Sequence, residues 1–516
     1  MTFSKPTLPN TLLFAFVAIV LAMSCNNAGN NTDTSDNKTS TEEQARKRYV
    51  RRNVYDPAAE KLLTDMAKAY DSMRKMDCSN PLSWYYQGAI HQVPDEITGK
   101  NELCPSYQST KDTLPAWDNC THTGDSTEFW NFAVWHRLYT YHLEKIVRKL
   151  SGNPEFALPY WGYCDTVNVQ QNRTMPALFR SNTSSLYASS RFDSLNNGQP
   201  VSGTYTKYLS LTKLFQNRDY FLFDQYLDFA PHGMMHNYIG GGNIGHTIFN
   251  PIFQDTTEDG GLMTQVQSAG FDPIFFVHHA EIDRIWQQWT NSARGKEITL
   301  EQMKASPWVY VFFDENGKRV VYTAEDVMKI IYTMDYDYDD TQVKPKEAPL
   351  TEKGLSFILT PQDTLVKQNV AKKVGTALKF SVTGKPAGAV ELFKTNENKG
   401  RESKIAVLTI KVSFPSRVTG MYDVYVNLPA GTTPDPEGNY FAGAMNFFGR
   451  DHIHKRASHA HTEAAKGFTA TFRFDMTDEF LATKALAKNK FDISIFKNHG
   501  RKTEELTIEE VTITIH

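Results

Sequence analysis

Residues 272–284 read DPIFFVHHAEIDR, and this stretch does more than any other to decide the fold. Its apolar residues continue at helical spacing, so we expect a buried helix over residues 275–289. Residues 132–139 read FAVWHRLY and belong to a second apolar pattern, which predicts a helix over residues 129–150 that ends before Gly152. The sequence therefore predicts a helical core in which two long helices carry histidines among aromatic side chains.

Six histidines fall into two triplets along the chain, and their pattern indicates a metal site. The first triplet is His91, His122 and His136, and the second is His232, His236 and His279. Three neutral imidazoles around one ion suit copper, and two such triplets suit a pair of copper ions that share one dioxygen. Zinc is the rival metal, but its sites usually mix cysteine or carboxylate ligands with histidine. We therefore expect two copper ions as cofactors and O2 as co-substrate.

Spacing decides which rings can meet at one ion. His232 and His236 are four residues apart, so a helix would place both rings on one face. His142 competes for the first triplet, but it lies about 240° around the helix from His136. We therefore expect His142 to face elsewhere. Taken singly, each histidine reads as an ordinary core or surface residue, and only the combination argues for metal.

The strings around His136 and His279 closely resemble the CuA and CuB signatures of the tyrosinase, catechol oxidase and molluscan hemocyanin superfamily. Residues 87–91 also resemble the surroundings of the first CuA histidine in plant polyphenol oxidases. The resemblance implies a type-3 dicopper site at the centre of a four-helix bundle. It also implies that His279 is the copper ligand of the histidine pair and that His278 lines the pocket beside it.

Cys120 and His122 form a Cys-X-His string, which fungal tyrosinases and molluscan hemocyanins share. In those proteins the sulfur is bonded to the imidazole, so the resemblance implies a thioether between Cys120 and His122. Such a bond would fix the orientation of a ligand that does not lie on a helix. The interval from His122 to His136 is longer than in the family pattern, with an inserted stretch at residues 123–128.

Three further residues bear on the reaction that the resemblance implies. Where the family can have a bulky residue over the pocket, this chain has Val266, which would leave the entrance open. A glutamate near the first CuB ligand can hold a water that deprotonates monophenols, and the corresponding residue here is the shorter Asp228. Asn237 could orient such a water or simply be solvated.

The resemblance implies an oxidoreductase that oxidises small phenols with O2. It would convert o-diphenols to o-quinones and would also hydroxylate monophenols, as a tyrosinase does. Three alternatives stay open, namely a catechol oxidase that acts on diphenols alone, a hemocyanin-like oxygen carrier, and a copper-storage protein. The net charge of −3 gives no sign of a nucleic-acid partner.

The first residues have the pattern of a targeting signal. An apolar run at residues 12–23 is shorter than the roughly 20 residues needed to span a bilayer, and it is followed by Cys25. Residues 1–25 therefore resemble a bacterial lipoprotein signal with Cys25 as the lipidated residue, and an ordinary secretory signal is the alternative. Residues 26–48 read as a flexible tether. The chain would then be exported and held at a bacterial membrane, periplasmic or at the cell surface, only by its lipid.

The period of the apolar pattern changes along the rest of the chain, and this change divides it into parts. Residues 49–295 form the helical dicopper part, residues 296–340 a middle segment that ends in a Tyr-X-Tyr string, and residues 341–360 a linker. Residues 361–516 alternate with period two, which predicts an antiparallel β-sandwich or barrel. The expected fold is therefore an α+β multidomain protein. The predicted strands cover residues 404–412, 422–426, 468–474, 490–496 and 511–515.

The middle segment and the last part resemble those of plant polyphenol oxidases, in the Tyr-X-Tyr string and in KFDIS at residues 490–494. In those enzymes the C-terminal domain covers the active site and keeps the enzyme latent until it is removed. Residues 452–461 hold four histidines, which could ferry copper or lie in a solvated loop. Cys78 and Cys104 are the pair that we expect to form a disulfide, which export permits.

Overall fold

The computed structural model describes residues 47–93, 104, 106, 116–122, 131–241, 248–257, 260–306, 308, 310–331, 333–343, 361, 363–385, 404–416, 418, 420–450, 467–499 and 505–516. The predicted signal with Cys25, the tether up to residue 46, most of the predicted linker and the histidine cluster at 452–461 lie outside these residues. Among the helices that the structure describes, none is long and apolar enough to cross a membrane.

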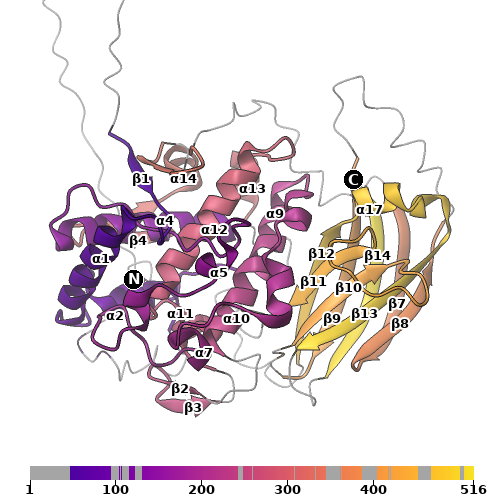
Figure 1. Cartoon of the computed structure of the whole chain (residues 1–516). Helices are drawn as coiled ribbons and strands as arrows, with labels where there is room; N and C mark the ends of the chain where they lie inside the picture. The colour runs from indigo at the N-terminus through magenta and orange to yellow at the C-terminus, as the bar shows by residue number, and fades with distance from the viewer. Residues whose placement is uncertain are drawn as a thin grey trace, which may run out of the picture. The chain divides into compact units, whose positions relative to one another are not determined.

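Helices dominate the first half of the chain (Figure 1). The longer ones are α1 (Ala59–Arg74), α2 (Trp84–His91), α4 (Phe132–Ser151), α9 (Tyr220–Leu227), the π-helical turn η2 (Asp228–Gly233), α10 (Met234–Gly240) and α12 (Ile274–Asn291). Short helices connect them: α5 (Val169–Asn172), α6 (Ala177–Arg180), α7 (Asp193–Asn196), η1 (Gly203–Leu209), α8 (Thr212–Phe215), η4 (Leu262–Thr264) and α11 (Val266–Ala269). The two helices predicted from apolar spacing, over residues 129–150 and 275–289, are therefore confirmed as α4 and α12, with ends that differ by a few residues.

Two buried carboxylates fix where the central helices α4 and α12 begin. The carboxylate of Asp224 accepts hydrogen bonds from the backbone N–H groups of Phe132 and Ala133, at 3.3 and 2.9 Å, in the first turn of α4. Asp272 accepts from the N–H of Ile274 at 3.1 Å and also binds the buried guanidinium of Arg191. Free N–H groups at a helix start need such acceptors when water is excluded. Both helices can therefore begin inside the core.

The middle segment ties the chain's first strand to the helices. It contains α13 (Leu300–Ala305), the hairpin of β4 (Tyr310–Phe313) and β5 (Arg319–Tyr322), α14 (Ala324–Ile330) and β6 (Tyr336–Tyr338). Strand β6 pairs in parallel with β1 (Tyr49–Arg51). A second small hairpin, β2 (Ile248–Asn250) with β3 (Asp255–Thr257), lies within the helical part.

A buried ion network centred on Asp283 joins these elements. Its carboxylate accepts hydrogen bonds from the hydroxyls of Tyr336 and Tyr338, each at 2.6 Å, and it pairs with Arg137 of α4 and with Arg51 of β1. Arg51 also pairs with Glu144 at 2.8 Å. The network gives the Tyr-X-Tyr string its role, because the string supplies two of the four donors. Glu144 and Asp283 therefore form buried ion pairs that connect β1, α4 and α12.

The last eight strands form a separate β part (Figure 1). They are β7 (Asp363–Val374), β8 (Ala377–Thr383), β9 (Ala406–Phe414), β10 (Met421–Val426), β11 (Phe441–Asn446), β12 (Phe468–Asp475), β13 (Lys490–His499) and β14 (Leu506–Ile515). One four-stranded sheet has the order β11-β10-β13-β8 and the other β12-β9-β14-β7, and the pairings recorded within both are antiparallel. The five predicted strands are present, whereas β7, β8 and β11 were not predicted. The short helices α17 (Thr477–Ala482) and η6 (Ala485–Ala487) interrupt the β part.

Charges of opposite sign join the helical part to the β part. Lys207 pairs with Asp423 and Lys213 with Glu479, both at 2.6 Å. Arg218 pairs with Asp475 and with Asp478, and Arg294 also reaches Asp478. In these pairs the cation comes from the helical part and the anion from the β part. The predicted disulfide between Cys78 and Cys104 is confirmed within the helical part.

We expect Asp283→Ala to lower the free energy of unfolding by about 3–5 kcal/mol, because it leaves the buried Arg137 guanidinium without its carboxylate and removes one of the two carboxylates that pair with Arg51. Asp71→Ala is the matched control, since Asp71 forms an exposed i,i+4 pair with Lys75 and should change stability by less than about 1 kcal/mol. Urea unfolding followed by tryptophan fluorescence measures both. Equal losses for the two variants would contradict a central role for the network.

Candidate metal centre

Seven buried histidines converge in the helical part, from five helical segments and one loop. They are His91 at the end of α2, His122 in the loop after Cys120, His136 in α4, His232 in η2, His236 in α10, and His278 and His279 in α12. The structure gathers them in two groups, within each of which the potential ligand atoms lie within 4.8 Å of one another. The first group holds His91, Cys120, His122 and His136, and the second holds His232, His236, His278 and His279.

The two groups are adjacent. The rings of His136 and His279 stack with centroids 4.2 Å apart and an interplanar angle of 8°. The rings of His122 and His232 lie 5.5 Å apart. Two ions bound at the two groups would therefore be close neighbours, as a shared small ligand requires.

His232 and His236 do not lie on one regular helix. Residues 228–233 form a π-helical turn in which Ala230 has the extended conformation φ −148°, ψ 123°, and α10 begins after it. The two ring centroids are still 4.5 Å apart, so the rings meet as the four-residue spacing predicts. Pro231 lacks an N–H and so favours the break before His232. π-Helical turns inside α-helices are frequent at functional sites.

Backbone carbonyl groups hold four of the rings in one orientation. Nδ1 of His91 lies 3.0 Å from the Val266 oxygen, and Nδ1 of His136 lies 2.8 Å from the Phe132 oxygen. Nδ1 of His232 and of His236 lie 3.0 and 2.8 Å from the carbonyl oxygens of Asp228 and Met263. A carbonyl oxygen only accepts, so Nδ1 must carry the proton in each ring. The lone pair then sits on Nε2, which is how metal-binding histidines are usually oriented.

The carboxylate of Asp228 holds one ring from each group. Its Oδ1 lies 2.8 Å from Nδ1 of His122 and 3.2 Å from Nδ1 of His232. Burial would raise the pKa of Asp228, but the two imidazoles outweigh burial and hold that pKa well below its usual range. Asp228 is therefore an anion that fixes rings, and it lies behind them. This placement differs from the sequence expectation that Asp228 holds a water for the substrate.

His278 and His279 both reach the second group. Nε2 of His279 lies 3.4 Å from Nε2 of His236, and its ring packs on Phe275 with centroids 4.0 Å apart. Nδ1 of His278 lies 2.8 Å from the hydroxyl of Tyr163, which anchors that ring from outside the group. His279 is the one that stacks against the first group, so it faces the space between the two groups.

Cys120 is a buried free thiol in the structure. Its sulfur lies 3.5 Å from Nε2 of His136 and belongs to the same group as His122. Burial raises the pKa of the Cys120 thiol well above its usual range, and the charge of Asp228 adds to this shift. A thiol that resists ionisation is a weak metal ligand compared with the imidazoles around it.

The histidines have the properties that a copper site needs. Burial lowers the pKa values of His136, His236, His278 and His279 well below the usual histidine range, and neighbouring imidazoles lower them further. The rings are therefore neutral, as metal ligands must be. Nε2 of His122 and of His232 is buried without a hydrogen-bond partner. Such orphaned acceptors are rare in protein interiors, and a bound ion would satisfy them. Two groups of buried imidazoles fit copper.

The other residues predicted to act in the site lie at its edge. Val266 is buried, and its carbonyl oxygen lies 3.0 Å from Nδ1 of His91. Asn237 is buried and donates from its side chain to Asn446 of the β part at 3.2 Å. It is therefore not solvated, and it connects α10 to the end of β11. His142 lies outside both groups, 2.9 Å from the hydroxyl of Tyr322, so it faces elsewhere as predicted.

A loop of the β part that the sequence did not single out covers the histidines. The ring of Phe448 stacks on His236 with centroids 4.3 Å apart and an angle of 25°, and it lies 5.5 and 5.6 Å from the rings of His122 and His232. Gly449 has a φ of +75°, and a Cβ there would lie 3.3 Å from the His122 ring. Arg450 follows, with its guanidinium 3.6 Å from Oδ2 of Asp228. Sequence offered no signal for this contact, because it joins residues more than 200 positions apart.

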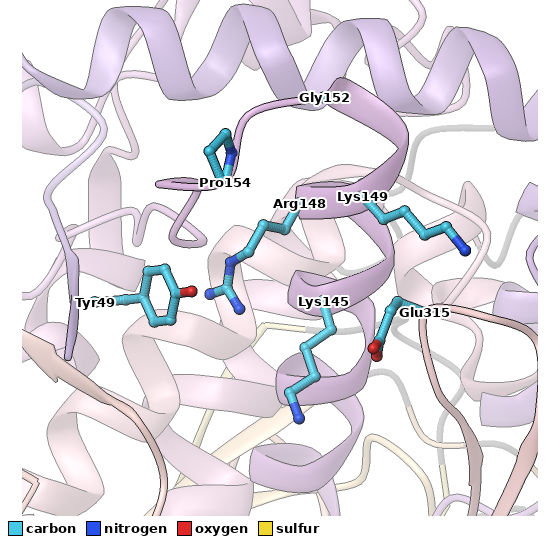
Figure 2. Close-up of a pocket in the computed structure, with 7 residues that line it drawn as sticks. All are labelled: Tyr49, Lys145, Arg148, Lys149, Gly152, Pro154 and Glu315. Carbon is cyan, nitrogen blue, oxygen red and sulfur yellow. The ribbon is translucent and has the colours of Figure 1, made fainter. Parts of the chain in front are cut away.

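An open hollow of about 480 Å³ lies elsewhere on the helical part. Figure 2 shows it beside α4, lined by Tyr49, Lys145, Arg148, Lys149, Gly152, Pro154 and Glu315. None of the seven histidines lines this hollow, so it is separate from the candidate metal centre.

Two family models match the chain. The common central domain of tyrosinase matches residues 81–209 and 176–292, which together contain all seven histidines. A domain of unknown function matches residues 367–516, which is most of the β part.

The chain is similar to known proteins along most of its length. It is 26% identical to a tyrosinase of Hahella sp. (strain CCB-MM4), over 78% of this chain and 85% of that protein. It is also 26% identical to a chloroplastic polyphenol oxidase of Malus domestica, over 75% of this chain and 67% of that protein. A solved structure of latent apple tyrosinase has a TM-score of 0.63 at 21% identity, covering 91% of this chain and 97% of that chain. A latent aurone synthase (polyphenol oxidase) also has a TM-score of 0.63, at 20% identity, covering 91% and 89%. The two structures share the fold, a helical core with C-terminal antiparallel sheets.

Copper added to the metal-free chain should raise its thermal midpoint, because an ion that binds only the folded state stabilises it by about 2.7 kcal/mol at 100 times its dissociation constant. His136→Ala should lose much of this rise, since it removes a ring from the first group. His142→Ala is the matched control on the same helix and should keep the rise. Differential scanning calorimetry with and without copper measures it, and an undiminished rise in His136→Ala would contradict the placement of the site.

Proposed function

This chain belongs to the tyrosinase and polyphenol oxidase family, and on that premise we propose that it is a copper oxidoreductase that converts o-diphenols to o-quinones with O2. The observation that carries the proposal is the pair of adjacent, buried groups of imidazoles. Each diphenol would give up two electrons and two protons, and two such turnovers would reduce one O2 to two waters. When bound, the copper pair supplies this redox chemistry.

We assign one copper to His91, His122 and His136 and the other to His232, His236 and His279. The Nδ1 contacts of five of these rings support the assignment, because each places the proton on Nδ1 and the lone pair on Nε2. His279 is preferred to His278 because it stacks on His136, between the two groups. In this proposal α2, α4, η2 with α10, and α12 surround the two coppers as a four-helix bundle.

An aromatic substrate suits the space that Phe448 occupies. The Phe448 ring lies in stacking contact with His236, close to rings of both groups. A phenol ring in the same place would make the same contact and would hold its oxygen atoms toward the coppers. Gly449 supports this fit, since any side chain there would crowd His122. We therefore propose that Phe448 keeps substrate out and that the chain is latent while the β part is docked.

The ion pairs between the two parts support latency, because they hold the Phe448 loop in place. Lys213 with Glu479 and Lys207 with Asp423 are largely shielded from water. Such pairs resist screening by salt better than exposed ones. Access to the site would then require displacement of the β part or of its loop.

Ortho-hydroxylation of monophenols is the finer activity, and it needs a group that accepts the phenolic proton. Asp228 is committed to His122, His232 and Arg450, so it is poorly placed for this role. Asn237 is held by Asn446 while the β part is docked, and it would be released when that part moves. We propose that diphenol oxidation is the principal activity and that monophenol hydroxylation depends on Asn237 after release.

Oxygen uptake by the copper-loaded full chain tests the proposal. We expect slow uptake with an o-diphenol in the wild type and uptake at least tenfold faster in Phe448→Ala, because the smaller side chain opens the space against His236. Phe496→Ala is the matched control, an aromatic of the same β part that packs on Tyr425 away from the histidines. It should behave as the wild type.

The outcomes separate the candidate functions. Uptake with the diphenol and with its matching monophenol would establish tyrosinase activity, and uptake with the diphenol alone would restrict the chain to catechol oxidation. Reversible oxygen binding without turnover in Phe448→Ala would indicate an oxygen carrier and exclude the proposed enzyme activity. Equal rates in Phe448→Ala and Phe496→Ala would overturn the role of Phe448.

We also propose the thioether between Cys120 and His122. The Cys-X-His string and the place of the sulfur in the first group support it. The bond would form when copper and O2 oxidise the site, with loss of one hydrogen from the thiol and one from the ring. Mass spectrometry of the peptide that holds both residues should give a mass lower by two hydrogen atoms after copper loading in air. An unchanged mass, in a chain shown to hold copper, would exclude the bond.

A further inference from the structure

The carboxylate of Asp228 divides its two oxygens between the histidines and the β part. Oδ1 faces Nδ1 of His122 and Nδ1 of His232, at 2.8 and 3.2 Å. Oδ2 faces the guanidinium of Arg450, at 3.6 Å. Arg450 is thus the third group around a carboxylate that touches a ring of each histidine group.

All members of this contact are shielded from water. Asp228 is 2% exposed, Arg450 is 5% exposed, and the two rings are 6% exposed or less. The Arg450 guanidinium also lies over the ring of Phe229, 4.7 Å from its centroid, which limits where it can move. Charged groups in such surroundings interact more strongly than at a surface. The Arg450 guanidinium therefore attracts Oδ2 of Asp228 by charge across 3.6 Å, which favours one orientation of the carboxylate.

We propose that Arg450 is a positioning residue for both metal sites, acting through Asp228. With Oδ2 held by Arg450, Oδ1 points at the two Nδ1 atoms and sets the orientation of His122 and His232. One contact from the β part would thereby support the copper geometry of both groups at once. The inference rests on the proposed function, since it takes these two rings as copper ligands.

The docked β part would then have two separate effects. Phe448 keeps substrate out of the site, whereas Arg450 helps the site to retain its metal. A carboxylate partner of a metal-binding histidine typically accounts for about 10- to 100-fold in metal affinity. Loss of the residue that orients this carboxylate should therefore weaken copper binding by up to that amount.

Competition between the full-length chain and a chelator of known affinity for copper measures this effect. We expect Arg450→Gln to lower the affinity of both copper-binding steps about tenfold, and Arg450→Lys to restore most of the loss by keeping the charge. In an Asp228→Asn background, Arg450→Gln should add little, because the carboxylate that it orients is already gone. Arg473→Gln is the matched control, since it removes the same charge from the same part of the chain, where Arg473 lies over Phe221.

The test is decided by whether copper affinity falls or rises in Arg450→Gln, and by whether one or both copper sites are affected. Unchanged affinity in Arg450→Gln would overturn the proposal, as would tighter binding, which is the result expected if Arg450 only repels a nearby cation. Weakening of one site alone, or equal weakening by Arg473→Gln, would also overturn it. A wild-type chain that fails to bind two coppers would refute the proposed function. A wild-type chain that binds two coppers, together with an Arg450→Gln variant of equal affinity, would instead overturn only the role of Arg450.

Discussion

The burial of seven imidazoles in the protein interior is the constraint on which this structure depends. Each ring has two nitrogens, and each buried polar atom needs a partner. For most rings Nδ1 finds its partner in the protein, at the carbonyl of Phe132 for His136 or of Met263 for His236. The Asp228 carbonyl comes from the π-helical turn, those of Met263 and Val266 come from the short helices after Gly261, and that of Phe132 comes from the first residue of α4. The orientation of the histidine rings therefore depends on this irregular backbone.

The rigidity that this arrangement needs comes from charge buried elsewhere in the core. Asp283 gathers Arg51, Arg137, Tyr336 and Tyr338, and so holds β1, α4, α12 and β6 at one point. That point lies one helical turn beyond His279 on α12. A shift of α12 against α4 would break the stack of His279 on His136. The Tyr-X-Tyr string, far from the histidines in sequence, thus contributes to their spacing.

The residues that sequence predicts well are those whose role is written in local spacing. His136 and His279 lie in helices with strong apolar periodicity, and the string around each of them closely resembles a family signature. Strands β9, β10, β12, β13 and β14 alternate clearly, whereas β7 carries many charged residues and β11 has small ones. The role of Asp228 was not predictable, because it depends on how His122 and Arg450 approach from other parts of the chain. The same holds for Phe448, because the histidine rings that it contacts lie more than 200 residues away in the sequence.

X-ray absorption at the copper edge of the copper-loaded full chain tests the central claim most directly. The claim is that two coppers lie side by side, each held by imidazoles alone. It predicts nitrogen ligands with the scattering pattern of imidazole rings and a second copper as a near neighbour. A sulfur ligand, which Cys120 could supply, or copper without a copper neighbour would contradict it.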